Sequence, residues 1–301
     1  MSVKETTVGS ADLLPEVTYA PRGLGRSMYL ALRRNPLAIV GSILLLMVVF
    51  LGILAPWITP HDPLEVNLKK KLLPPGGEYL LGTDDMGRDL LSRCIFGFRI
   101  SLRAAATVLS LACSIGIVLG ATAGYLGGRI DNLIMRFTDM FLAFPGYILA
   151  LAIAGALGAS LTNATISVAA VWWPWYARLV RGQVLSVKQN LYIDAVTAIG
   201  AGDLRILFRH ILPNCITPIL VLLTMDVGIV ILVMANLSFL GLGAQPPEPE
   251  LGYMIARGRL YFMSQWWVAT VPGAAIFVMA LGTNLLGDAW RDILDPRTLS
   301  R

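Results

Sequence analysis

Long runs of apolar residues recur along this chain of 301 residues, and they restrict its possible folds more than any other feature. The first run, residues 37–58, supplies about 20 consecutive mostly apolar residues, enough for a helix to cross a hydrocarbon core of about 30 Å. In lipid, only helices and closed barrels satisfy all their backbone hydrogen bonds. We therefore expect an all-α membrane protein.

The composition supports this class and excludes others. Hydrophobic residues make up 56% of the chain and charged residues 14%, with a mean hydropathy of +0.68. The net charge of +5 could suggest nucleic acid, but the basic residues lie between the apolar runs and form no stripe, so no nucleic acid partner is expected. Cys94, Cys113 and Cys215 lie too far apart for a CxxC pair, so neither a disulfide framework nor a metal site is predicted.

We expect about six transmembrane helices, which would place both termini on one side. The expected spans are residues 37–58, 104–126, 137–157, 164–177, 216–240 and 267–286. The segment before the first span is too long and too mixed in charge for a signal peptide, so this span should be retained as an anchor. Basic residues favour the side of the N-terminus, which is therefore expected to be cytoplasmic.

This topology divides the chain into five parts. In order, they are a cytoplasmic segment (1–36), the first transmembrane helix (37–58), a periplasmic or extracellular segment (59–103), a five-helix core (104–290) and a cytoplasmic tail (291–301). The apolar and basic stretch 90–102 is expected to form an interfacial or elbow helix before the second span.

Four glycines recur at every fourth position along the second span and its end: Gly116, Gly120, Gly124 and Gly128. Small residues at this spacing let two membrane helices approach closely, and close contact must replace the hydrophobic force that lipid does not provide. The pattern predicts helix packing.

Asp226 lies near the middle of the fifth span, where a charge costs about 2.5 to 3.5 kcal/mol on insertion scales. It should therefore face protein or water. Two interpretations stay open: a residue that faces a transport pathway, and a buried carboxyl that is hydrogen-bonded to a neighbouring helix or protonated.

The inner segment, residues 191–213, is too polar to span and indicates two short helices with a break between them. Gly200 can end the first helix, Asp203 can cap the second, and Pro213 limits its continuation. Small residues such as Ala195, followed by basic Arg205, suit a docking element; the alternative is a helix lying on anionic lipid.

The same segment resembles the cytoplasmic EAA motif of binding-protein-dependent ABC importer permeases. The residues at its positions are Asp194, Ala195, Val196, Gly200, Leu212 and Pro213. Asp194 and Val196 replace the usual Glu and second Ala, and His210 replaces Ile. The resemblance implies that this segment, including Arg205 and Arg209, docks into partner ATPases.

Further stretches are similar to the second-permease type of the dipeptide, oligopeptide and nickel transporter family. They are residues 81–93, 124–145, 237–252 and 284–297, and Leu251 departs from the aromatic usual at its position. The resemblance implies a type I ABC importer fold of the MetI-like kind in the cell inner membrane. Peptides are the first expected cargo, with nickel complexes, glutathione and sugars as alternatives.

The resemblance also implies partners: a homologous second permease, two ATPase subunits and an extracytoplasmic substrate-binding protein. The chain contains no GxxxxGK[ST] loop, so ATP and Mg²⁺ are expected on the partner subunits, and the chain itself is expected to be neither an enzyme nor a holder of a cofactor. The last outer loop, with Gln245, Pro246, Pro247 and Glu248, is expected to face the binding protein; an ordinary rigid turn is the alternative.

Two other function classes remain as alternatives. A secondary transporter normally shows inverted repeats and an ion site at the membrane midplane, and the sequence offers only Asp226. A catalytic membrane protein needs clustered titratable groups, whereas the two histidines, His61 and His210, are expected on opposite sides. The acidic group Asp84, Asp85 and Asp89 is expected to cap a helix and pair with arginines, which is favoured over metal binding.

Overall fold

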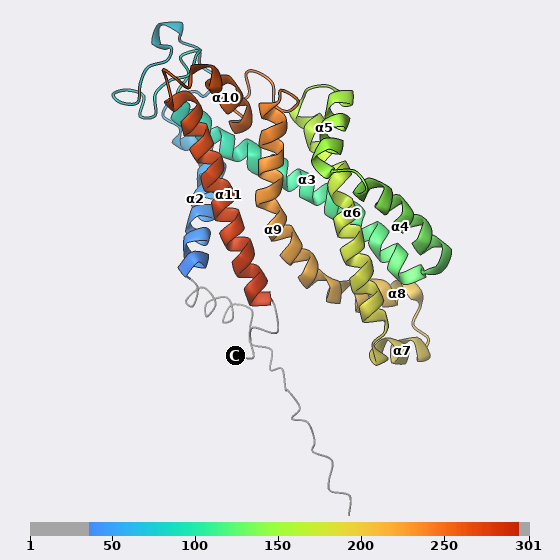
Figure 1. Ribbon diagram of the computed structural model, residues 1–301. Helices are drawn as coiled ribbons and strands as arrows, with labels where there is room; N and C mark the ends of the chain where they lie inside the picture. Colours follow the sequence, from blue (N-terminus) through green and yellow to red (C-terminus); the bar gives the residue numbers. More distant parts are fainter. Residues whose placement is uncertain (1–35, 295–301) are drawn as a thin grey trace, which may run out of the picture.

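The computed structural model describes residues 36–294, which form a bundle of helices (Figure 1). The expected segment 1–36, apart from its last residue, and the end of the tail, 295–301, lie outside the described residues. The α-helices are α2 (Pro36–Ile58), α3 (Leu90–Leu126), α4 (Gly128–Leu142), α5 (Gly146–Leu157), α6 (Leu161–Lys188), α7 (Leu191–Ala198), α8 (Asp203–Ile206), α9 (Leu212–Phe239), α10 (Leu251–Gly258) and α11 (Trp267–Leu294). Shorter helical turns are η1 (Leu68–Lys70), η2 (Leu207–Ile211) and η3 (Arg259–Tyr261).

Within residues 36–294, four helices are long and apolar enough to cross a membrane. They are α2, α3, the continuous run Asp203–Phe239 and the first part of α11, and the bent pair α4 and α5 would make a fifth. The all-α membrane fold is confirmed, but this criterion does not reproduce all six expected spans. α6 has sufficient length, with 28 residues, but it carries Arg178 and Arg181 among many polar side chains.

α3 packs along α6 through the predicted glycines. A Cβ atom on Gly116 would lie 2.3 Å from Cβ of Tyr176, and one on Gly120 would lie 2.4 Å from the carbonyl oxygen of Ala177. A Cβ atom on Gly124 would lie 2.9 Å from Cβ of Val184. The packing prediction is thus confirmed for three glycines. It is wrong for Gly128, which has a φ of +56°, begins α4 and has no neighbour within 4 Å of such a Cβ.

Two expected elements differ in the structure. Residues 90–102 are not a separate elbow helix but the first part of α3, which has 37 residues, so the expected boundary at 103/104 falls inside a helix. The expected third span, 137–157, is instead divided between α4 and α5, whose axes differ by 86°. Pro145 precedes α5, and the residue before a proline is disfavoured in helical conformation, which explains the break.

Several prolines are accommodated within helices, and two of them bear on the expected elements. α6 continues through Pro174, and the run α8, η2 and α9 continues past Pro213. In that run the N–H of Leu212 donates to the carbonyl of Leu207. The separation of these two residues along the chain is the wider one of a π-helix. Such a π-bulge adjusts the hydrogen-bond ladder just before the proline. The expectation that Pro213 limits the second short helix is therefore wrong.

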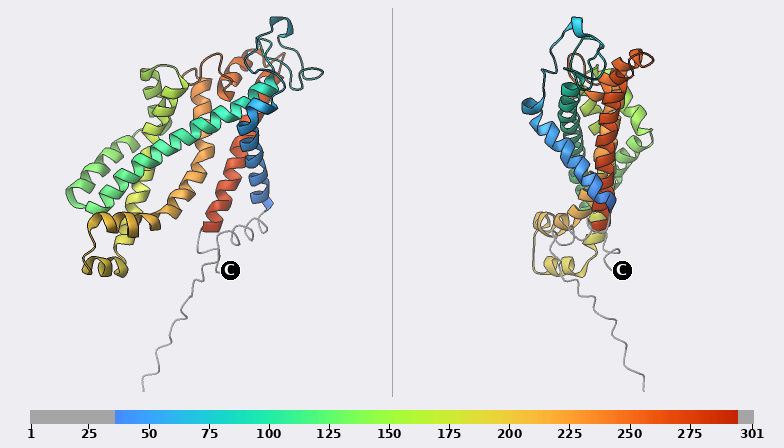
Figure 2. Two further views of the ribbon diagram at one scale, coloured as in Figure 1. Left: turned by 180° about the vertical axis from the view of Figure 1, so that it is seen from behind. Right: turned by 90° about the vertical axis from the view of Figure 1, so that its left-hand side faces the viewer.

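The bundle has two distinct ends. α7 and α8 lie at one end, where α2 begins and α11 ends (Figure 1). The loop between α2 and α3, together with α10, lies at the opposite end, and the two views of Figure 2 agree on this. We call these the inner end and the outer end.

Candidate functional sites

The inner segment projects from the bundle and exposes apolar side chains. Ile193 anchors α7, with 4% of its surface exposed, whereas Leu191 and Ile199 are each 84% exposed and Leu204 is 73% exposed. Exposed apolar groups gathered on one small segment mark an interaction surface.

The turn between α7 and α8 depends on Gly200. α7 ends at Ala198, and Gly200 has a φ of +85°, a left-handed conformation that favours glycine. Its N–H donates to the carbonyl of Thr197 at 2.9 Å. The expectation that Gly200 ends the first helix is confirmed.

Asp203 does not have the expected capping role. Gly202 occupies the cap position with an extended backbone, and Asp203 is the first residue of α8. Its Oδ1 instead accepts a hydrogen bond of 2.7 Å from the hydroxyl of Tyr125, at the end of α3. Lys188 donates to the carbonyl of Tyr125 at 2.8 Å. These contacts connect α8 to the ends of α3 and α6.

The other residues of the EAA-like motif lie together at the inner end. Val196 and Leu212 are half-buried, and the remaining members are exposed: Asp194, Ala195, Gly200, Arg205, Arg209 and Pro213. The structure therefore leaves this segment accessible to a partner, and whether the partner is an ATPase stays a prediction.

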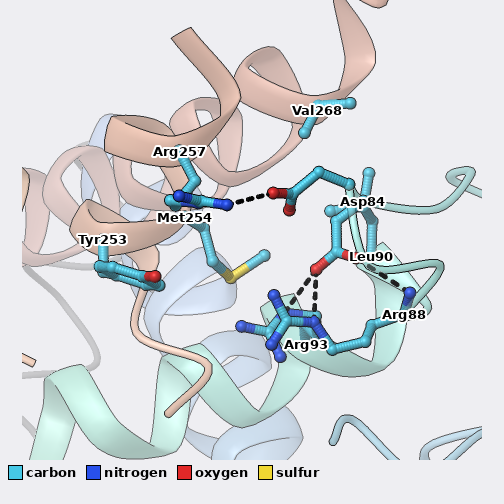
Figure 3. A pocket seen from close by; sticks show the side chains of 9 residues that line it. Asp84, Arg88, Leu90, Arg93, Tyr253, Met254, Arg257 and Val268 are labelled. Atoms are coloured by element: carbon cyan, nitrogen blue, oxygen red, sulfur yellow. Dashed lines mark hydrogen bonds and ion pairs between the residues drawn. The ribbon is translucent and has the colours of Figure 1, made fainter. Parts of the chain in front are cut away.

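A network of buried charges holds the outer end together (Figure 3). Asp84 accepts a hydrogen bond of 2.7 Å from Nε of Arg88 and pairs with Nε of Arg93 at 3.5 Å. Arg93 is 1% exposed and donates through Nη1 to the carbonyl of Pro63 at 2.8 Å. This network fixes the loop before α3 against the start of that helix.

The neighbouring acidic residues complete this arrangement. Asp85 pairs with Arg257 of α10, and this hydrogen bond raises the pKa of Arg257. Asp89 caps α3, because its Oδ2 accepts a hydrogen bond of 2.9 Å from the backbone N–H of Ser92. The expected caps and ion pairs are confirmed.

The loop between α9 and α10 exposes a short tip. Pro246, Pro247 and Glu248 are exposed, and the peptide bond between the two prolines is cis. Gln245 is half-buried and donates to the carbonyls of Gly241 and Gly243 at 3.0 and 3.1 Å. The tip is therefore anchored and accessible, but its expected contact with a binding protein is untested.

Behind this tip, Glu250 is 3% exposed and caps α10, accepting a hydrogen bond of 2.8 Å from the N–H of Tyr253. Burial raises the pKa of Glu250. No sequence pattern indicated a role for this residue.

Asp226 lines a cavity of about 700 Å³ between α5, α6 and α9. Its Oδ2 accepts two hydrogen bonds from α6, at 2.8 Å from the hydroxyl of Tyr176 and at 3.2 Å from Nε1 of Trp172. The buried carboxyl of the second interpretation is thus observed, and the same residue also borders a space large enough for a small ligand. A pathway role is compatible with this position.

Sequence reasoning missed the partners of Asp226. Trp172 and Tyr176 lie four residues apart, so they share one face of α6, and this spacing was available as a signal. The pair Asp85 and Arg257 is separated by 172 residues and gave no local signal.

Comparison with known proteins places the chain in a family. Residues 116–300 match the family described as binding-protein-dependent transport system inner membrane component, and residues 23–75 match the N-terminal TM domain of oligopeptide transport permease C. The first match alone covers more than half of the chain.

Three relatives extend nearly end to end. The dipeptide transport system permease protein DppC of Haemophilus influenzae is 43% identical over 287 residues, covering 93% of this chain and 97% of the relative. The di/tripeptide transport system permease protein DppC of Pseudomonas aeruginosa is 44% identical, covering 87% and 89%. The nickel transport system permease protein NikC of Escherichia coli is 40% identical, covering 86% and 93%.

These similarities agree with the helical membrane bundle and with the exposed inner segment. They also confirm the resemblance based on the EAA-like motif and on the four stretches quoted above. The chain belongs to the binding-protein-dependent transport system inner membrane components, as a permease of the dipeptide, oligopeptide and nickel type.

Proposed function

We propose that this permease imports dipeptides or short oligopeptides and forms half of the translocation pathway. The support is that relatives named for dipeptide and di/tripeptide transport match nearly the whole chain. The cavity beside Asp226 is the part of the described chain that we assign to the pathway, because it places a carboxyl group in the middle of a membrane-spanning helix.

The exposed inner segment carries the proposed mode of action. Leu191, Ile199 and Leu204 are apolar groups that a groove on an ATPase would bury. The ATPases hold ATP and Mg²⁺, and their movement reaches the bundle as a rigid-body displacement. This chain is then a transport subunit and not an enzyme.

Two further partners, a binding protein and a second permease, are part of the proposal. The tip formed by Pro246, Pro247 and Glu248 meets the extracytoplasmic binding protein, and a homologous permease completes the pathway. The start of α2 and the end of α11 lie at the same end of the bundle as α7 and α8 (Figure 1). This arrangement supports a cytoplasmic location for both termini.

A nickel importer is the second candidate function. The nickel permease of Escherichia coli is 40% identical over most of this chain, so family membership alone does not separate the two cargoes.

One purification tests the assembly. The tagged chain is solubilised gently from its native membrane, and copurifying proteins are identified by mass spectrometry. Two ATPases, a second permease and a binding protein are expected. Recovery of the chain alone in several detergents would contradict the proposal and favour a self-sufficient secondary transporter.

Reconstituted vesicles that contain the complete assembly then distinguish the cargoes. ATP-dependent uptake of radioactive dialanine, and not of radioactive nickel, is expected. The opposite result would replace peptide transport by nickel transport.

A further inference from the structure

The cavity beside Asp226 contains two opposite charges in an otherwise apolar and aromatic wall. Among its described lining residues, Asp226 of α9 is the only acid and Arg178 of α6 the only base. Tyr147, Trp172 and Trp175 provide aromatic surface between them. Its volume of about 700 Å³ falls within the range usual for small-molecule sites.

Asp226 lacks a cationic partner in the described part of the chain. Both hydrogen bonds reach Oδ2 and come from neutral donors, the hydroxyl of Tyr176 and the indole N–H of Trp172. No side chain of residues 36–288 donates to Oδ1. A carboxylate in a membrane span is normally paired with a cation or faces water, so this site is complementary to a positive group entering the cavity.

The aromatic lining favours an organic ammonium group as that cation. The faces of Trp and Tyr rings attract ammonium groups, and more strongly when these are desolvated. A divalent metal ion instead prefers several oxygen, nitrogen or sulfur ligands, and the cavity offers a single carboxylate. The lining therefore matches an amine better than a bare metal ion.

Arg178 is available for an anionic group. It pairs with Asp139 of α4 at 2.6 Å, but the two side chains are 52% and 62% exposed. Exposed ion pairs of this kind contribute little to stability, so a ligand carboxylate can replace Asp139 at low cost.

The positions along α6 of the residues near the two charges are compatible with a short peptide. Trp172 and Tyr176, which hold Asp226, precede Arg178 by six and two positions, which corresponds to about 3 to 9 Å along the helix axis. An extended dipeptide spans at most about 7 Å, and a tripeptide about 10 Å.

We propose that this cavity binds both charged ends of a short peptide, with the amino terminus at Asp226 between the aromatic rings and the carboxyl terminus at Arg178. This inference rests on the proposed peptide transport. It adds that the permease itself selects its cargo by recognising both charged ends of the peptide.

The test uses the purified importer complex without its binding protein, so that only the permease selects. A photoreactive dipeptide with a diazirine side chain is offered with free ends, and in a second sample with an acetylated amino end and an amidated carboxyl end. Labelled residues are mapped by mass spectrometry. The free peptide should label α6 or α9 around the cavity at least about tenfold more than the blocked peptide.

Three variants assign the ends. Asp226→Asn and Arg178→Gln should each reduce labelling by the free peptide toward the blocked level, whereas Asp139→Asn, which leaves Arg178 in place, should retain it within about twofold. Asp226→Asn should also lose discrimination against a peptide acetylated only at its amino end, and Arg178→Gln against one amidated only at its carboxyl end. If Asp226→Asn fails to assemble, Arg178→Gln and the comparison of free and blocked peptides still decide.

Equal labelling by free and blocked peptides, or unchanged labelling in both variants, would overturn the inference. Uptake by wild-type vesicles separates this failure from that of the proposed function. Vesicles that import dialanine while labelling ignores the peptide ends refute only the cavity assignment, whereas vesicles that import no peptide refute peptide transport itself.

Discussion

The outer and inner ends of the bundle are stabilised in different ways. At the outer end, charged side chains are buried and paired: Asp84 and Arg93 are only 5% and 1% exposed. At the inner end, Leu191 and Ile199 are each 84% exposed, and α8 is connected to the bundle through the hydrogen bond between Tyr125 and Asp203.

This difference lies in how the charged groups are held, because exposed apolar side chains occur at both ends: Leu80 and Met263 of the outer end are 65% and 97% exposed. The outer end pairs buried Asp84 with Arg88 and Arg93 from its own loop and the start of α3. The inner end leaves apolar groups exposed to water. Covering them with another surface would lower the free energy, because apolar area would then be removed from water. Substitutions at the outer end should therefore change stability, and substitutions at the inner end should mainly change coupling.

The largest loss of stability is expected from Asp84→Ala. This change leaves Arg88 and Arg93 buried without their shared carboxylate, and removing one member of a buried pair costs about 3 to 5 kcal/mol. We expect a lower melting temperature in detergent and faster trypsin cleavage within residues 59–89.

The matched control is Asp62→Ala in the same loop. Asp62 is exposed, and its carboxylate only accepts a local hydrogen bond of 2.8 Å from the N–H of Leu64. Its loss should cost less than about 1 kcal/mol. Equal effects of the two substitutions would show that the buried network does not stabilise the outer end.

Gly200→Val should have a smaller effect on stability and a larger one on coupling. A side chain in the left-handed conformation costs about 1 to 2 kcal/mol, and this cost falls on the turn between α7 and α8. We expect faster hydrogen exchange of the α7 amides and a loss of substrate-stimulated ATP hydrolysis in the reconstituted importer, with membrane insertion intact.

Gly202→Ala is the control for that substitution. Gly202 has a φ of −71°, and no atom lies within 4 Å of an added Cβ. It should retain stimulated hydrolysis. If Gly200→Val retains it as well, the turn does not control docking.

Tyr125→Phe should weaken the connection between α3 and α8 without altering either helix. The lost hydrogen bond to Asp203 contributes about 0.5 to 1.5 kcal/mol. Hydrogen exchange should accelerate in α8 and stay unchanged in α10. Tyr147→Phe, at a tyrosine without a hydrogen bond from its hydroxyl in the described part of the chain, should leave α8 unaffected. An unchanged α8 in Tyr125→Phe would instead indicate that packing alone holds it.

The sequence allowed correct prediction of several features whose determining signal was local. Apolar runs predicted the helical membrane fold, the glycine repeat predicted close helix packing, and Gly200 predicted the end of the first short inner helix. Each of these depends on the residue's own conformational or steric properties, which are independent of distant parts of the chain.

The missed features depend on distant neighbours. Arg257 meets Asp85 across 172 residues, and Asp203 turns to Tyr125 because the end of α3 lies beside it. The continuity of α9 past Pro213 depends on a π-helical turn that no local rule predicted. Tertiary contacts decided the first two cases, and a local adjustment of the backbone decided the third.

The smallest effect is expected from Glu250→Gln, because glutamine keeps an oxygen that can cap α10. Burial raises the pKa of Glu250 above the value of about 4.5 expected in the unfolded chain. The native state therefore binds this proton more tightly, so the contribution to stability is fully present below the unfolded pKa and is lost as the pH rises through the folded pKa. Melting temperatures measured from pH 4 upward should fall in the wild type and less steeply in Glu250→Gln.

Glu248→Gln, two residues away and exposed, is the control and should follow the wild type. Parallel curves for the wild type and Glu250→Gln would exclude Glu250 as the titrating group. Because Glu250 caps α10, hydrogen exchange over the same pH range should change in α10 and not in α7. A change in α7 instead would mean that the two ends are coupled through the bundle, and the contrast between an outer end held by buried ion pairs and an inner end that is stabilised separately would then have to be abandoned.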